Sequence, residues 1–114
     1  MKLTGKAKED FEKWLDSNDE IQDTANRDSL MHHWLTFKGF GSLAKSMQYG
    51  VYVDWFDSVG VNISLQSFYY ADLDSFRYWV SIRDILKHKY LLDTRQEARL
   101  KAIEKANEIY NKQN

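Results

Sequence analysis

The stretch DTRQEARLKAIEKANEIYNKQN, from Asp93 to Asn114, decides the fold of the C-terminal part of the chain. Thr94 and Glu97 are spaced as a capping box, in which the Thr hydroxyl accepts from the Glu97 amide and the Glu carboxylate accepts from the Thr94 amide. Behind the cap, small and apolar residues recur at three- and four-residue steps: Ala98, Ala102, Ile103, Ala106, Ile109 and Tyr110. This pattern predicts an amphipathic helix with a narrow stripe suited to lying close against a sheet.

The residues before this helix alternate as strands do. Val61, Ile63 and Leu65 alternate with polar residues, which predicts a half-buried strand. A second strand has one apolar row and one polar, aromatic row: Phe76, Tyr78, Val80 and Ile82 against Arg77, Trp79, Ser81 and Arg83. We expect the apolar row to pack on the terminal helix.

Two connections complete the sheet. Residues 69–75 carry Asp72 and Asp74 and are expected to form the turn between the first two strands. A short third strand is expected near 89–92, after a turn between residues 84 and 88.

Three helices are expected before the sheet. The first runs from Thr4 to Asp16 with Thr4 as its N-cap, and the second from Ser29 to Lys38. The third runs from Leu43 to Ser58 and is terminated by Gly60 in the C′ position. Aromatic and β-branched residues at 49–56 would also suit a strand, which is the alternative for this segment.

These elements predict a single α+β domain over residues 1–114. It consists of an N-terminal helical part, 1–42, and an α-β-β-β-α unit, 43–114. N-terminal helices precede a three-stranded antiparallel sheet, and the C-terminal helix packs on that sheet.

The composition excludes several classes of protein. The chain has 114 residues, 43% hydrophobic and 29% charged, as in ordinary globular proteins. Its net charge of -1 gives no global attraction to nucleic acid, and the absence of Cys excludes disulfides, a thiolate nucleophile and a Cys-based zinc site. No apolar run is long enough for a membrane span or typical of a signal peptide, so we expect a cytoplasmic protein without membrane association.

Two phrases resemble a known group of proteins: SMQYGVYVDWFDSVGVNI, Ser46 to Ile63, and DTRQEARLKAIEKANEIYN, Asp93 to Asn111. They are similar to small uncharacterised proteins carried by bacteriophages and prophages. The shared features are a MQ-G-V--DWFDS-G helix and a terminal TRQEA---AIEKANEIYN helix separated by strands. The resemblance implies a mobile-element origin and the cytoplasm of a bacterial host, and it brings neither an activity nor site residues.

The order helix, three strands, helix is also similar to the double-stranded-RNA-binding domain. The segment Thr94 to Ala98 resembles the start of the last helix in that family. The first strand connection, however, is acidic and lacks the Gly-Pro-x-His element of the family. One Arg and a Glu stand where the family has paired lysines, so the chain departs from the family at both of these features.

The polar row of the second strand is the main candidate site. Trp79 lies between Arg77 and Arg83, and Lys87 or Lys89 joins them from the third strand. An indole among cations is a stacking platform for a nucleotide or nucleic-acid base. In the alternative, the N-terminal helices cover this face and Trp79 belongs to the core.

The loop with Tyr69, Tyr70 and Asp72 is a second candidate, because an acidic, aromatic loop is typical of a protein-binding surface. In the alternative, the two tyrosines close the end of the core.

Other residue pairs do not predict catalysis or metal binding. His32 and His33 are adjacent and point about 100° apart on a helix, so they cannot chelate one ion. Asp54 and Asp57 could share a helix face, but they lack further ligands, and a Mg²⁺-dependent hydrolase is only an outside alternative. We therefore expect no catalytic residues, no metal and no cofactor.

The resulting functional expectation is a non-enzymatic phage or prophage accessory protein that binds a host or phage protein, with a homodimer as one form of that interaction. The alternative is binding of a nucleotide or nucleic acid, including sequestration of a nucleotide signal, through Trp79 flanked by Arg77 and Arg83.

Overall fold

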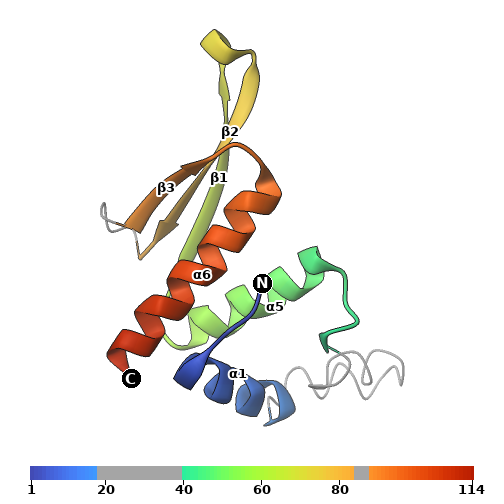
Figure 1. Ribbon diagram of the computed structural model, residues 1–114, viewed down its shortest axis with the longest axis vertical. Helices are drawn as coiled ribbons and strands as arrows, with labels where there is room; N and C mark the ends of the chain where they lie inside the picture. Colours follow the sequence, from blue (N-terminus) through green and yellow to red (C-terminus); the bar gives the residue numbers. More distant parts are fainter. Residues whose placement is uncertain (18–39, 84–87) are drawn as a thin grey trace.

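The computed structural model describes residues 1–17, 40–83 and 88–114 (Figure 1). The elements are α1 (Gly5–Ser17), α5 (Lys45–Ser58), β1 (Ile63–Tyr70), the 3-10 turn η1 (Ala71–Leu73), β2 (Ser75–Ile82), β3 (Lys89–Leu92) and α6 (Arg95–Gln113). This order confirms the predicted α+β class. The helix expected over Ser29–Lys38 lies outside the described residues.

The three strands form one antiparallel sheet in the order β1-β2-β3. β1 and β2 pair without interruption from Ile63↔Ile82 to Tyr70↔Ser75. β3 pairs only with the part of β2 that runs from Tyr78 to Ser81. The far end of the β1–β2 hairpin therefore continues as a two-stranded ribbon, which projects beyond the other elements in Figure 1.

α6 lies against the sheet as its sequence predicts. Its N-cap Thr94 accepts from the Glu97 amide at 3.1 Å, and the alanines of its stripe are fully buried. Across from them, Val80 and Ile82 of β2 have no exposed surface. Alanines have no side chain beyond Cβ, so the helix approaches the strands closely.

Phe76 departs from the predicted apolar row. Its side chain is 52% exposed, whereas the row was expected to pack on α6 throughout. The register explains the difference, because Leu92, the last residue of β3, pairs with Tyr78, and α6 begins just after it. The helix therefore begins level with the middle of β2, and Phe76 lies beyond it.

α5 ends at Ser58 with Gly60 in the C′ position, as predicted, so the strand alternative for residues 49–56 is wrong. The Val61 amide donates to the Phe56 carbonyl at 2.8 Å and the Gly60 amide donates to Asp57 at 3.2 Å. Gly60 has φ +80, a left-handed conformation that glycine adopts without a Cβ penalty. Phe56 and Val61 are both buried, which completes the hydrophobic contact of a Schellman motif.

α1 begins next to Thr4 as expected, but its first turn is bonded by α6. Asn111 accepts from the Ala7 amide at 2.8 Å and donates to the Thr4 carbonyl at 2.9 Å. Asn107 accepts from the Thr4 amide at 2.9 Å and donates to the Thr4 hydroxyl at 3.0 Å. Two asparagines of the last helix thus fix the start of the first helix.

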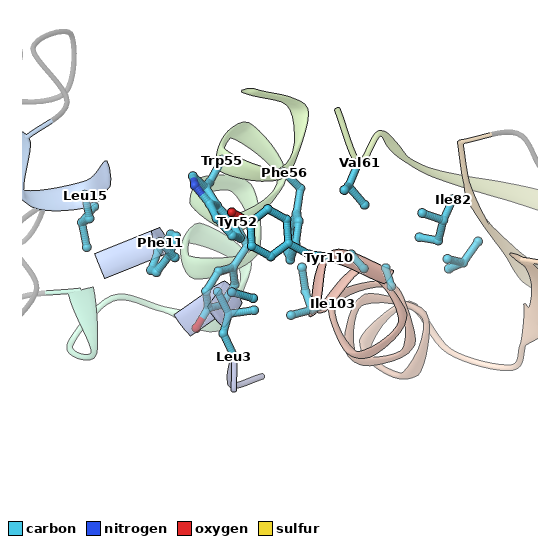
Figure 2. Close-up of a cluster of buried hydrophobic side chains, with 14 of the residues drawn as sticks. Leu3, Phe11, Leu15, Tyr52, Trp55, Phe56, Val61, Ile82, Ile103 and Tyr110 are labelled. Carbon is cyan, nitrogen blue, oxygen red and sulfur yellow. The ribbon is translucent and has the colours of Figure 1, made fainter. Parts of the chain in front are cut away.

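The N-terminal helices build an aromatic core with α6 (Figure 2). The Phe11 ring lies 4.9 Å from the Tyr52 ring and 5.7 Å from the Trp55 ring, measured between centroids. Trp55 in turn lies 5.0 Å from Tyr110 of α6. α1 and α5 therefore pack on α6 and on each other, and Trp79 of β2 is not among the described residues of this core.

Candidate binding surfaces on the hairpin

The sheet face turned away from α6 collects the residues predicted to bind a ligand. Opposite residues in a ladder share a face, and Gln66 pairs with Trp79 as Phe68 pairs with Arg77. We call this surface the open face: Ser64, Gln66, Phe68, Tyr70, Arg77, Trp79, Ser81, Lys89 and Leu91.

Trp79 is half-buried on the open face. Its indole N–H donates to the Tyr70 hydroxyl at 2.8 Å, and the Lys89 ammonium lies 5.1 Å from the ring centroid. With Gln66 and Phe68 these residues line an open cavity of about 410 Å³. The indole thus borders a recess. An aromatic ligand that stacked on the indole there would contact the same ring as the Lys89 ammonium.

Arg77 lies on the open face, but its charge is already paired. Its Nε atom is 3.0 Å from the Asp93 carboxylate, and its Nη1 atom donates to the Ser75 hydroxyl at 2.8 Å. Asp93 was missed at the sequence level. It continues β3 by one residue, so the β2–β3 register places it directly opposite Arg77.

Arg83 was predicted to flank Trp79, and this prediction is wrong. Arg83 follows the end of β2 with φ +58, so the chain leaves the sheet at this residue. Its guanidinium donates to the Gly60 carbonyl and to Gln113 of α6, both at 2.9 Å. Arg83 therefore links the end of β2 to the segment after α5 and to the end of α6. Lys87, another of the predicted cations, lies outside the described residues.

The predicted turn at residues 69–75 is shorter than expected. β1 continues through Tyr70 and β2 begins at Ser75, which leaves η1 and Asp74 as the connection. Tyr69 and Tyr70 therefore point to opposite faces of the ribbon rather than forming one loop surface. Tyr70 bonds Trp79, whereas Tyr69 packs edge-on against Phe76 at 5.4 Å.

The end of the hairpin, residues 68–76, carries four exposed large apolar side chains, and we call it the hairpin tip. The exposed fractions are 47% for Phe68, 54% for Tyr69, 56% for Leu73 and 52% for Phe76. Asp72 is exposed in η1. The Tyr69 hydroxyl donates to Asp74, and this hydrogen bond raises the pKa of the tyrosine.

Asp54 and Asp57 are the two carboxylates considered for catalysis. Asp54 and Asp57 are exposed on α5, and Asp57 accepts from the Asn62 side chain at 3.0 Å. Within residues 1–17, 40–83 and 88–114, no three His, Cys, Asp or Glu side chains are grouped for a metal ion. His32 and His33 lie outside these ranges.

Comparisons with known proteins do not identify the chain. No family model, no curated protein and no solved structure matches it. Among the helices that the structure describes, none is long and apolar enough to cross a membrane.

Proposed function

We propose that the protein is a non-enzymatic binding module that docks on a protein partner through its hairpin tip. The setting implied by the sequence resemblance is a bacteriophage or prophage, so the partner is a host or phage protein. The observation that carries the proposal is the gathering of Phe68, Tyr69, Leu73 and Phe76, all about half exposed, within one projecting ribbon. Single exposed apolar residues are ordinary, but a group of them is typical of an interaction site. Here Tyr69 and Phe76 are in ring contact on one face of the ribbon, and Phe68 is exposed on the other face.

The tip also has the stiffness that docking favours. The β1–β2 ladder extends unbroken to Tyr70↔Ser75, and the Tyr69 and Phe76 rings contact each other across it. Aromatic side chains on a fixed backbone provide contact area with little loss of conformational freedom on binding. The proposal therefore requires no folding of the tip when the partner binds.

The charge of the tip indicates the kind of partner surface. Asp72 and Asp74 lie beside the apolar residues, and Arg77, the first residue after the tip, is paired with Asp93. A complementary partner has an apolar recess with basic side chains around it.

The test uses two positions with the same apolar character and similar exposure. Phe76 on the tip and Leu100 on α6, 48% exposed, are each replaced by a photoreactive benzoylphenylalanine in the bacterial cells that make the protein. We expect a defined adduct from position 76 and none from position 100. Absence of an adduct at position 76, or equal adducts at both positions, would overturn the proposal.

The captured partner is then purified and titrated by calorimetry against the wild type and two variants. Phe76→Ser is expected to weaken binding about tenfold or more, as a central apolar contact does. Leu100→Ser is the matched control and is expected to bind as the wild type does. Equal affinity of all three proteins would contradict docking by the tip.

A second candidate function is nucleotide or nucleic-acid binding on the open face, favoured by the recess beside Trp79 and Lys89. Its test is quenching of tryptophan emission by ATP and by a short oligonucleotide. Quenching should disappear in Trp79→Phe and weaken in Lys89→Ala. Lys101→Ala is the control, since Lys101 lies in the same way over Tyr90, at 5.8 Å, and not over Trp79. Unchanged quenching in Trp79→Phe would exclude this site.

A further inference from the structure

β1 is an edge strand whose outer side is paired with no strand among the described residues. The Arg83 amide donates to the Asn62 carbonyl at 2.8 Å, in line with the β1–β2 register. Bonded and non-bonded pairs alternate along an antiparallel ladder, so the odd-numbered residues of β1 direct their N–H and C=O groups outward. These residues are Ile63, Leu65, Ser67 and Tyr69.

This edge lacks the features that normally prevent strand pairing. The sequence of β1, ISLQSFYY, has no charge, no proline and no glycine, and its ladder has no bulge. Soluble proteins usually protect an edge with one of these features or keep it very short. The opposite edge is protected: β3 has four residues, begins at Lys89 and is followed by the Arg77–Asp93 ion pair.

We propose that β1 pairs antiparallel with β1 of a second copy of this chain, about a two-fold axis normal to the sheet. An uncharged strand can meet itself without opposing like charges. β1 is also self-complementary, because its first half carries Ile63 and Leu65 and its second half carries the exposed Phe68 and Tyr69. Antiparallel pairing brings the aliphatic half of each copy opposite the aromatic half of the other.

Two registers satisfy this geometry, one centred on Gln66 and one on Ser67. Both keep the α6-side residues of the two copies on the same side of a six-stranded sheet. In the first, Ile63 of one copy faces Tyr69 of the other, and in the second Leu65 does. Aliphatic–aromatic pairs of this kind stabilise neighbouring strands.

The dimer goes beyond the proposed function and is compatible with it. Its interface is the outer edge of β1, whereas Leu73 lies in η1, past the end of β1, and Phe76 lies on β2, opposite Tyr69 on the inner side of β1. Phe68 and Tyr69 belong to both surfaces, and Leu73 and Phe76 remain outside the dimer edge. The two hairpin tips would point in opposite directions, so each dimer would present two docking surfaces.

The test is sedimentation velocity over a series of protein concentrations, with two lysine variants. The wild type is expected to shift from monomer to dimer as concentration rises. Ser67→Lys places a charge at the centre of the edge in either register and is expected to raise the dimer dissociation constant about fivefold or more. Ser46→Lys on α5, also exposed, makes the same change in net charge and is expected to leave the dissociation constant unchanged.

Amide hydrogen exchange of the wild type gives a second readout that requires no variant. The outward amides of Ile63, Leu65, Ser67 and Tyr69 are expected to become protected as concentration rises, while those of α1 keep a constant rate. A monomer at all concentrations, or a dimer that Ser67→Lys leaves unchanged, would overturn the proposal. So would exchange at the four amides that does not depend on concentration.

Discussion

The two halves of the β1–β2 hairpin have the same alternation and the same ladder, yet their surroundings are opposite. In the proximal half, Val80 and Ile82 are fully buried in the core cluster that also contains residues of α1, α5 and α6. In the distal half, Phe76 continues the same row and is half exposed, because β3 and α6 do not extend that far. One strand thus serves as core at one end and as exposed surface at the other. An apolar row in the sequence therefore predicts which face of a strand can be buried, but it does not predict whether another element covers that face.

The largest expected effect separates the two halves by truncating one side chain in each. Ile82→Ala is expected to lower the free energy of unfolding by about 2–5 kcal/mol, because it leaves a cavity in a filled core. Phe76→Ala is expected to cost about 1 kcal/mol or less, since only its contact with Tyr69 is lost. Denaturant unfolding measures both values, and similar losses would show that the distal half is packed as the proximal half is.

The next effect concerns the three helices α1, α5 and α6, which we call the helical body. It tests whether specific polar contacts, as well as apolar packing, hold these helices together. Asn111→Ala removes the acceptor of the Ala7 amide and the donor to the Thr4 carbonyl. We expect a loss of about 1–2 kcal/mol, comparable with loss of a helix N-cap. Lys112→Ala, at the next and exposed position, is the control and should change the stability by less than about 0.5 kcal/mol. A smaller loss for Asn111→Ala than for Lys112→Ala would contradict the assigned contacts.

A third prediction uses two tyrosine–aspartate hydrogen bonds, one in each region. In the body, Tyr110 donates to Asp10 at 2.5 Å, and burial together with this carboxylate raises the pKa of Tyr110 to about 12. The unfolded value is 10.0, so the contribution of Tyr110 to stability is complete below pH 10 and is lost as pH rises toward 12. We expect stability to fall across this window in the wild type and to fall less in Tyr110→Phe.

Tyr69 and Asp74 make the corresponding pair on the hairpin tip. Because Tyr69 is exposed, solvent screens its interaction with Asp74, and Tyr69→Phe should leave the alkaline fall in stability nearly as in the wild type. Thermal unfolding at pH steps from 9 to 12 measures all three proteins. If Tyr110→Phe and Tyr69→Phe reduced the alkaline fall in stability equally, the expected difference between the helical body and the hairpin tip would be contradicted.

The smallest expected effect lies at the border between the halves, where Arg77 meets Asp93. Asp93 is largely exposed, so Asp93→Asn should change the free energy of unfolding by about 0.5 kcal/mol or less. High salt should reduce that difference further. A loss several times larger would indicate that the ion pair, rather than the ladder, fixes where the sheet narrows to the ribbon.

The elements that sequence reasoning predicted well depend on local signals. The Thr94–Glu97 spacing, the Gly60 position after an apolar helix and the alternation over 76–82 each involve residues close together in the chain. Their physical causes are capping, left-handed backbone freedom and the two-residue repeat of a strand. These causes operate without knowledge of distant contacts.

The errors in the candidate site have non-local causes. Whether Phe76 is covered depends on where α6 begins relative to β2. The direction of the Arg83 side chain depends on the left-handed backbone conformation of Arg83 itself, directly after the strand. Asp93 could have been identified as the partner of Arg77, because a register that pairs Leu92 with Tyr78 also places Asp93 opposite Arg77. For Tyr69 and Tyr70, two aromatic residues with high β-propensity were a signal that the strand continued.

The most direct test of the contrast between the two halves is NMR of the protein in the presence of a soluble paramagnetic agent that broadens solvent-exposed signals. The ring signals of Phe76 should broaden strongly, whereas the methyl signals of Val80 and Ile82 on the same side of β2 should remain sharp. Protection of Phe76 equal to that of Val80 would contradict an exposed hairpin tip, and with it the proposed docking surface.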